Sequence, residues 1–299
     1  MKIANWNIEW MNHWFSGGSG PAALRPSGEI PGGVSDVEAL CARVAAVIAG
    51  LRADVLTLQE GPSRREEMAL FVDQFLNSAY AVHGPSGKGA QKLYVLVRQN
   101  GAAQGAQLIP AAAPLDLSGS WEVDIDGNLA LQPYAFTREP LVLEVTDAGS
   151  ARRVRIINVH LKSKFVRDGE RMWRDPARKQ EFIREALLAR RRISAEAMRL
   201  RAYLDALLDE DIGRAVVVCG DYNDGPGSDF FEQHYLTHNL VAAIAGNPFE
   251  PPFMLRHGFI DRELPNAISP PSSTTSSTAS KTVTSCSITS WCPRDSTGT

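Results

Sequence analysis

Acidic and amide side chains directly follow an apolar run in the last third of the chain: residues 216–219 read VVVC and residues 220–225 read GDYNDG. Hydrolysis of a phosphoester needs a water molecule that a carboxylate orients, and donors or cations that stabilise the charge building up on the phosphoryl oxygens. Asp221 and Asn223 supply one group of each kind, and their i, i+2 spacing predicts that both side chains lie on the same side of an extended segment. The alternative is an ordinary turn rich in aspartate and asparagine.

A second polar cluster follows the apolar run at residues 156–159, where His160, Lys162 and Ser163 occur close together. His160 could hydrogen-bond a phosphate oxygen, and Lys162 could add positive charge. A lone histidine is more often a core or surface residue, but these three polar groups come directly after a strand, where loops carry function. We therefore expect His160 at the reacting phosphate and Lys162 and Ser163 among the substrate contacts.

A candidate metal site comes from two further segments. Glu60 ends the run LTLQ at residues 56–59, and Asn7 lies within WNIEW at residues 6–10. A carboxylate and an amide oxygen are hard ligands that suit Mg²⁺, which keeps several of its own waters and needs only one or two carboxylates. The alternative for Glu60 is a solvated residue at a strand end.

The elements that must position these side chains alternate along the chain. Apolar or β-branched runs between turn residues predict strands, and apolar residues at helical spacing predict helices. The predicted strands are 2–8, 53–59, 92–98, 141–145, 153–159 and 215–219, and the predicted helices are 34–51 with Ser35 as N-cap, 64–76 and 176–209. Strands in both halves with helices between them fit two sheets packed face to face, with helices outside.

The overall composition is that of an ordinary globular protein. The 299 residues are 44% hydrophobic and 22% charged, and the net charge of -3 argues against a generic nucleic-acid coat. Residues 152–201 nevertheless hold sixteen of the 31 Lys and Arg residues, which predicts either a local basic face or a long helix with solvated arginines. The cysteines lack the Cys-x-x-Cys spacing of a zinc site. Without a signal-like start or an apolar stretch of ~20 residues, we expect a cytoplasmic protein with no membrane span.

Together the motifs resemble those of the endonuclease/exonuclease/phosphatase superfamily, the exonuclease III and DNase I-like proteins. The resemblance rests on the order and approximate spacing of an Asn-containing first strand, LQE at 58–60, NVHLKS at 158–163 and GDYND at 220–224, and it covers about residues 1–262. It implies a four-layered α/β sandwich of two packed mixed β-sheets flanked by helices. The site would lie at the joined ends of the two sheets.

The resemblance also implies a role for each residue of the site. Asn7 and Glu60 would bind the divalent metal, Mg²⁺ or Mn²⁺. Asp221 would orient or activate the attacking water, while Asn223 and His160 would hold the scissile phosphate. The implied activity is that of a metal-dependent phosphodiesterase or nuclease, by in-line attack of water on phosphorus.

A further resemblance concerns the substrate. Residues 137–141 (TREPL) are similar to the family's Arg-x-Pro strand, which would place Arg138 near the phosphate. DNA, RNA, phosphoinositide and nucleotide substrates all remain open. An unrelated zinc or serine hydrolase lacks support, because neither His-Glu-x-x-His nor Gly-x-Ser-x-Gly occurs.

The chain departs from the family pattern after about residue 262. The family's late Asp-His strand and final Ser-Asp-His are absent, and eighteen of the 32 residues from Ile268 onward are Ser or Thr. Such a segment cannot bury enough apolar surface to offset its ordering entropy, so residues 263–299 are predicted to be a disordered tail and the sheet to lack its last strands.

We interpret the tail as the product of a frame shift near residues 265–268. Residues 287–293 (SITSWCP) can be encoded so that reading begun two bases later gives Asp-His-Ile-Leu-Val-Ser, the missing strand. Tail codons that cannot yield this strand would contradict the hypothesis. Loss of a catalytic Asp/His pair commonly costs ~10³-fold in rate, so the alternative to an active hydrolase is a catalytically silent binding or remnant protein of the same fold.

Overall fold

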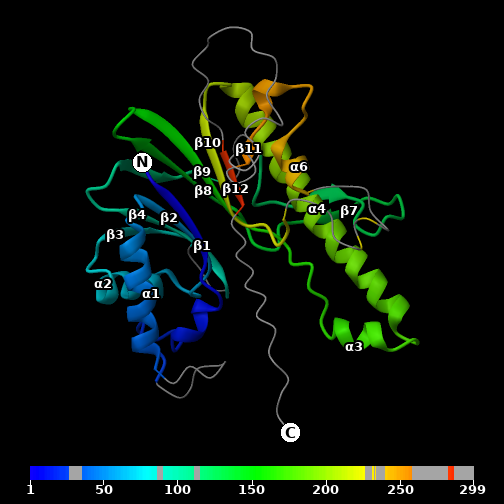
Figure 1. Cartoon of the computed structure of the whole chain (residues 1–299), viewed down its shortest axis with the longest axis horizontal. Coiled ribbons are helices and arrows are strands. Elements are labelled where there is room, and N and C mark those ends of the chain that lie inside the picture. The colour runs from blue at the N-terminus through cyan, green and yellow to red at the C-terminus, as the bar shows by residue number, and fades with distance from the viewer. Residues whose placement is uncertain are drawn as a thin grey trace.

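Two mixed β-sheets lie face to face, and helices cover the outer face of each sheet (Figure 1). The computed structural model describes residues 1–26, 36–85, 90–110, 115–225, 231, 233, 240–257 and 282–285. The order of layers is helices, sheet, sheet, helices. The four-layered α/β sandwich expected from the sequence is therefore confirmed.

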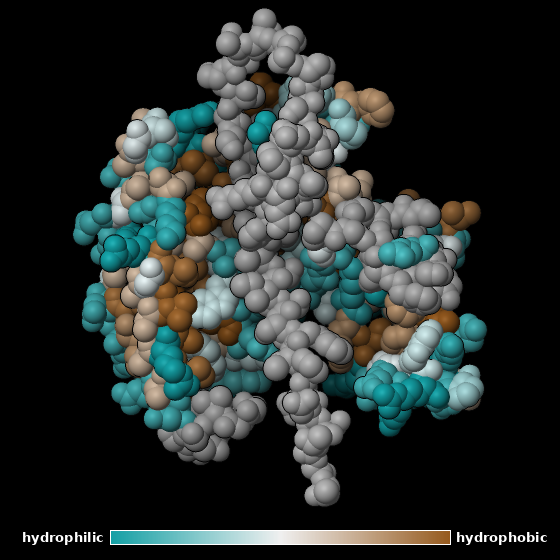
Figure 2. Space-filling view, viewed as in Figure 1, coloured by the Kyte–Doolittle hydropathy of each residue, from teal (hydrophilic) through white to brown (hydrophobic). Residues whose placement is uncertain are grey.

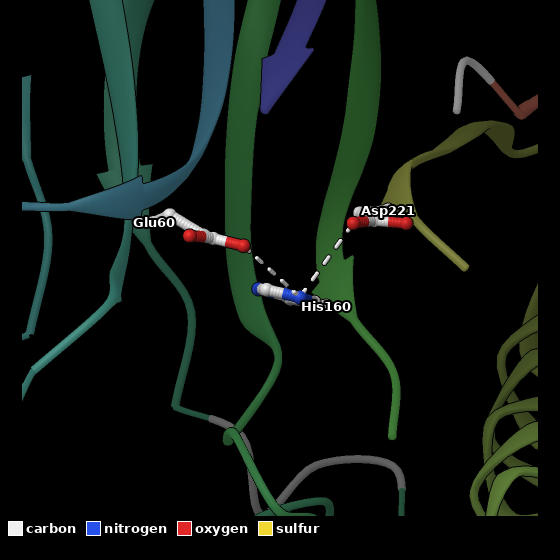
Figure 3. A group of neighbouring side chains, drawn as sticks. All are labelled: Glu60, His160 and Asp221. Carbon is white, nitrogen blue, oxygen red and sulfur yellow. Dashed lines mark ion pairs between the residues drawn. The ribbon is translucent and has the colours of Figure 1, made fainter. Parts of the chain in front are cut away.

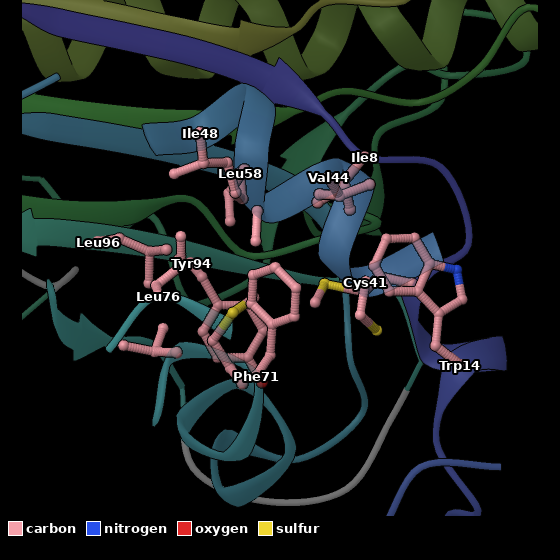
Figure 4. Close-up of a cluster of buried hydrophobic side chains, with 14 of the residues drawn as sticks. Ile8, Trp14, Cys41, Val44, Ile48, Leu58, Phe71, Leu76, Tyr94 and Leu96 are labelled. Atoms are coloured by element: carbon pink, nitrogen blue, oxygen red, sulfur yellow. The ribbon is translucent and has the colours of Figure 1, made fainter. Parts of the chain in front are cut away.

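The first sheet is mixed. Its strands, in spatial order, are β1 (Ile3–Asn7), β2 (Val55–Gly61), β4 (Lys92–Arg98) and β3 (Tyr80–His83). β1 and β2 are parallel, whereas β4 is antiparallel to both of its neighbours. The outer face packs against helices α1 (Val37–Leu51) and α2 (Arg65–Phe75), and their apolar side chains form one core with those of the sheet (Figure 4).

The second sheet holds four neighbouring parallel strands at one side. Its strands, in spatial order, are β11 (Arg256–His257), β12 (Thr282–Ser285), β10 (Ala215–Asp221), β9 (Arg152–His160), β8 (Leu141–Asp147) and β5 (Ala103–Leu108). β8 is antiparallel to both β9 and β5. Helices α4 (Lys179–Glu210) and α6 (Leu240–Ala245) pack on the outer face.

Alternation along the strands fills the space between the sheets. On β2, Leu56 belongs to the core under α1 and α2, whereas Val55 packs with Ile156 and Leu143 of the second sheet. Neighbouring residues of a strand point to opposite faces, so one strand contributes to two cores. Cys219 of β10 is buried and belongs to the core between the sheets.

Smaller elements complete the chain. They are η1 (Met11–Trp14), the hairpin of β6 (Trp121–Val123) and β7 (Gln132–Tyr134), α3 (Gly169–Arg174) and η2 (Pro251–Phe253). The surface over α3 and the start of α4 is mostly hydrophilic (Figure 2). No helix in the described ranges has both the length and the apolar character needed to cross a bilayer.

Some expectations differ from the structure. Helix α1 is capped by Asp36, whose side chain accepts from the Ala39 amide at 2.9 Å; Ser35, the expected cap, lies outside the described residues. Strand β5 was not expected, because its sequence AQGAQL lacks an apolar alternation. Thr282–Ser285 form strand β12 beside β10, although the tail was expected to have no order; its other residues lie outside the described ranges.

Several arginines of the basic segment are structural. Arg155 is buried and donates to Glu144 at 2.9 Å and to the Tyr203 hydroxyl at 3.2 Å. Arg201 is also buried and donates to Asp205 at 2.6 Å. A buried guanidinium of this kind needs such partners, since an unpaired one is strongly disfavoured. Part of the basic segment therefore forms neither an open basic face nor a solvated helix surface.

Candidate active site

Four of the predicted site residues meet at one edge of the sandwich. Asn7 ends β1, His160 ends β9 and Asp221 ends β10, while Glu60 lies one residue before the end of β2. β9 and β10 are parallel with His160 opposite Asp221, so their side chains leave the sheet together. Figure 3 shows Glu60 facing these two residues from the other sheet.

The distances within this group are short. His160 Nε2 lies 3.6 Å from Asp221 Oδ2 and 3.9 Å from Glu60 Oε1. Asn7 Nδ2 donates to Asp221 Oδ2 at 2.8 Å and to Glu60 Oε1 at 3.2 Å. The two carboxylates are largely removed from water, with side-chain exposures of 13% for Glu60 and 9% for Asp221. The structure thus brings two carboxylates, an imidazole and an amide from both sheets to one point.

Unusual backbone conformations position the two carboxylates. Glu60 has φ 57° at an irregularity in the pairing of β2 with β4, which turns its side chain away from the strand's normal alternation. Gly220, next to Asp221, has φ +147°, and a Cβ atom there would overlap the Val159 carbonyl. Only glycine adopts this conformation at low cost. The sequence GD at the end of β10 therefore lets the strand approach β9 closely where Asp221 begins the site.

Burial sets the charge of the imidazole. Burial, together with the positive charge of Arg138, lowers the pKa of His160 to about 4 against the opposing effect of Asp221 and Glu60. His160 is therefore neutral at pH 7. Its Nδ1 is buried and has no hydrogen-bond partner among the described residues, whereas Nε2 faces the carboxylates. Nε2 is thus the nitrogen within reach of a ligand at this site.

The donor set fits a divalent cation. Ligand atoms of Glu60, His160 and Asp221 all lie within 4.8 Å of one another. Two ligand atoms that each lie about 2.1 Å from Mg²⁺ are at most about 4.2 Å apart, and the observed 3.6 and 3.9 Å are within that limit. In the described part of the chain, neither carboxylate forms an ion pair with a lysine or arginine. A cation between them would offset their mutual repulsion.

The Asn7 amide lies next to this group with its nitrogen toward the carboxylates. Its Oδ1 accepts the backbone N–H of Glu9 at 3.1 Å. As a ligand, Asn7 would need to present the oxygen instead, because the amide nitrogen has no available lone pair. Metal binding by Asn7 stays a prediction, and the structure gives it a second task, that of bridging Glu60 and Asp221.

Asn223 differs from the sequence expectation. Its φ of 51° places it in the left-handed region, so the segment after Asp221 is not extended and the predicted same-side arrangement is wrong. Its backbone N–H donates to Asp221 Oδ1 at 2.8 Å, and its side chain donates to the Leu161 carbonyl at 2.8 Å. Asn223 therefore links the loops that follow β9 and β10, and one amide hydrogen remains for a ligand.

The other predicted substrate contacts are Arg138, Lys162 and Ser163, and each has hydrogen-bond partners outside the group of Glu60, His160 and Asp221. Arg138 Nη2 donates to Gln91 Oε1 at 2.8 Å, and Gln91 Nε2 donates to Glu60 Oε2 at 3.1 Å, so Arg138 is one residue removed from the carboxylates. The Lys162 backbone N–H donates to Glu196 at 2.6 Å. The Ser163 hydroxyl accepts from the Phe165 N–H at 3.1 Å and forms a local turn.

Sequence reasoning missed Gln91 and Glu196. Nothing in the sequence marks Gln91 as a site residue, because a polar residue before a strand is common. Glu196 could have been found, since Ile193 and Leu200 place it on the apolar face of α4, where it is fully buried. A carboxylate on the buried face of a helix needs hydrogen-bond donors, so its position indicates a structural or functional partner.

No protein-family model matches the sequence, and no curated protein matches it either. Similar solved structures include truncated Caenorhabditis elegans TDP2, with 15% identity and a TM-score of 0.36 over 62% of this chain and 55% of that one. Humanized D. rerio TDP2 is 14% identical, with a TM-score of 0.39, over 75% of this chain and 67% of that one. The human Nocturnin catalytic domain is 16% identical, with a TM-score of 0.37, over 68% of this chain and 63% of that one. The chain thus spans little more than half the length of the C. elegans protein. Its own layers and strand order define a four-layered α/β sandwich.

Proposed function

We propose that the chain is a metal-dependent phosphoester hydrolase of the phosphodiesterase or nuclease type. One observation carries the proposal: the buried carboxylate of Asp221 and the half-buried carboxylate of Glu60 face a neutral imidazole and have no lysine or arginine ion pair among the described residues. Such a pair favours a bound cation. Glu60 and Asn7, with Asp221 within reach, would hold Mg²⁺ or Mn²⁺, and the bound ion would stabilise charge on the phosphoryl oxygens.

The side chains of the chain would divide the remaining tasks. Asp221 would orient the attacking water, because a buried carboxylate held by Asn7 and the Asn223 amide has a fixed geometry. His160 would donate from Nε2 to a phosphoryl oxygen, as would the second amide hydrogen of Asn223. Arg138, held by Gln91, would add positive charge on the substrate side.

A rate measurement with and without metal tests this proposal. We expect hydrolysis of bis(p-nitrophenyl) phosphate in Mg²⁺ or Mn²⁺, no hydrolysis in EDTA, and a loss of ~10³-fold in Glu60→Gln. The matched control is Glu66→Gln, which removes an exposed carboxylate on α2 and should leave the rate unchanged. Turnover that persists in EDTA would contradict metal dependence.

A catalytically silent protein of the same fold is the second candidate. It is favoured by the absence from the sequence of the family's late Asp-His strand. Within the described ranges, His160 is the only imidazole grouped with the carboxylates. This candidate predicts that Mg²⁺ raises the unfolding temperature but that no phosphodiester is hydrolysed in any divalent metal. That result would support the silent protein over the active hydrolase.

A further inference from the structure

The buried carboxylate of Glu196 fixes two loops beside the site. Its Oε1 accepts the Thr137 backbone N–H at 2.9 Å and the Tyr134 hydroxyl at 3.1 Å, and its Oε2 accepts the Lys162 backbone N–H at 2.6 Å. Hydrogen bonds to an ionised carboxylate are stronger than neutral ones. Glu196 therefore holds the loop before β8 and the loop after β9 next to each other, at the residues that adjoin or carry Arg138 and Lys162.

Three cationic side chains come together around this anchor. Arg192 lies one helical turn before Glu196, on the same side of α4. The positive charges of Arg138 and Arg192 and the negative charge of Glu196 all act on the Lys162 ammonium. The charge of Arg192 also acts on Tyr134, which bonds Glu196. The hydrogen bonds of Glu196 thus bring the loops that carry Arg138 and Lys162 next to the side of α4 that carries Arg192.

These cations are poorly neutralised. Among the described residues, the Lys162 ammonium and the Arg192 guanidinium form no hydrogen bond or ion pair, and Arg138 donates only to the neutral Gln91. Glu196 acts on both Arg138 and Lys162, but its one negative charge stands against three positive charges. The cluster therefore presents net positive charge to whatever enters the space.

Other arginines of α4 are committed elsewhere. Arg199 donates to the Asp116 carbonyl at 2.7 Å and lies over the Trp121 ring, and Arg201 pairs with Asp205. Arg191 packs against Gly127 in the β6–β7 loop. Arg192 differs from these three because its guanidinium has no partner in the described part of the protein.

The cluster adjoins the candidate active site. Gln91 bridges Arg138 and Glu60 with hydrogen bonds of 2.8 and 3.1 Å, so the cations begin one side chain away from the carboxylate group. The carboxylates of Glu60 and Asp221 suit a metal ion that would bind the scissile phosphate, whereas three cations around the single carboxylate of Glu196 suit a second anion. Arginine binds phosphate oxygens in a bidentate manner, and lysine binds them as a point charge.

We propose that Arg138, Lys162 and Arg192 form an anion subsite that binds a second phosphate group of the substrate, beside the phosphate that is cleaved. The inference rests on the proposed function and narrows its substrates to phosphoesters that carry two phosphate groups. A nucleotide unit with a phosphate on each side has this chemistry, and so does a phosphorylated inositol.

Binding measurements on the full chain in Mg²⁺ test the subsite. We expect thymidine 3′,5′-bisphosphate to bind at least about tenfold more tightly than thymidine 5′-monophosphate in calorimetric titration, because the second phosphate gains charge-assisted hydrogen bonds. Arg192→Gln should abolish this preference and leave monophosphate binding unchanged. Arg192→Lys, which keeps the charge, should restore part of it. Inositol 1,4-bisphosphate, titrated in parallel, tells which kind of bisphosphate the subsite accepts.

The matched control is Arg191→Gln, which removes the same charge from the neighbouring residue and should keep the preference. The subsite is overturned if neither bisphosphate binds more tightly than the monophosphate, or if Arg192→Gln with an unchanged unfolding temperature keeps the wild-type preference. Turnover is a separate readout: a preserved preference without metal-dependent hydrolysis would contradict the proposed function and support the subsite.

Discussion

Gln59 donates from Nε2 to Oδ1 of Asn158 at 2.6 Å, and this buried hydrogen bond joins the two sheets directly beneath the site. Gln59 precedes Glu60 on β2, and Asn158 lies two residues before His160 on β9. The candidate active site is split between the sheets, with Glu60 on one and His160 on the other. The amide pair therefore sets the relative position of the two halves.

The first prediction concerns this amide pair. Asn158 also donates to the carbonyls of Leu58 and Tyr94 at 3.1 and 3.0 Å, so Asn158→Ala removes three buried hydrogen bonds. We expect the free energy of unfolding to fall by about 3 kcal/mol or more in urea titration. Asn128→Ala, in the exposed β6–β7 loop, is the control. A loss below about 1 kcal/mol would show that the pair does not hold the sheets together.

The second prediction concerns a tyrosine next to Asp221. The Tyr222 hydroxyl is buried and has no hydrogen-bond partner among the described residues. Tyr222→Phe should therefore leave stability unchanged or raise it by about 1 kcal/mol. Tyr203→Phe makes the same change at a hydroxyl that accepts from Arg155 at 3.2 Å, and it should lower stability by about 1 kcal/mol. Equal effects in the two variants would be inconsistent with this account.

The third prediction concerns Gly220, where β10 approaches β9. An alanine Cβ would overlap the Val159 carbonyl at φ +147°, so Gly220→Ala should cost at least about 3 kcal/mol of stability. Gly225→Ala is the matched control, because nothing lies within 4 Å of its added Cβ. Thermal unfolding of the two variants measures the difference. Similar unfolding temperatures would mean that β10 tolerates a side chain at this position.

The fourth prediction is a pH dependence of stability at Glu144. Burial raises the pKa of this carboxyl, but hydrogen bonds from Arg155 and the charges of Arg155 and Arg153 outweigh it and hold the pKa below its ordinary value. A carboxyl with a lowered pKa in the folded state stabilises the fold above its unfolded pKa of about 4.3 and loses this contribution as the pH falls through the lowered value.

Comparison with Glu144→Gln isolates that contribution. Wild type should be more stable than Glu144→Gln at pH 7 in urea titration, and the difference should shrink below about pH 4 as the carboxylate is protonated. A difference that stays constant down to pH 3 would rule out the ion pairs with Arg155 and Arg153 as its source.

The buried strands and the polar residues at their ends could be predicted from the sequence, whereas one edge strand and several residues around the site could not. Strands buried on both faces have continuous apolar sequences, so β2, β9 and β10 and the polar residues at their ends could be recognised. The edge strand β5 could not be recognised, because its sequence is mostly polar. Asn223 was misplaced, because a left-handed φ after a strand is set by its hydrogen bonds to Asp221 and Leu161 rather than by its spacing. Gln91 and Glu196 act through contacts with residues distant in sequence, which periodicity does not reveal.

The rate of phosphodiester hydrolysis by Asp221→Asn in Mg²⁺, relative to wild type, is the decisive measurement for metal-dependent hydrolysis at this site. The substitution keeps the size of the side chain and removes one of the two charges that face His160. The account predicts a metal-dependent wild-type rate that falls by ~10³-fold or more in the variant, with the unfolding temperature unchanged or raised. A variant that hydrolyses the substrate within tenfold of the wild-type rate would contradict it.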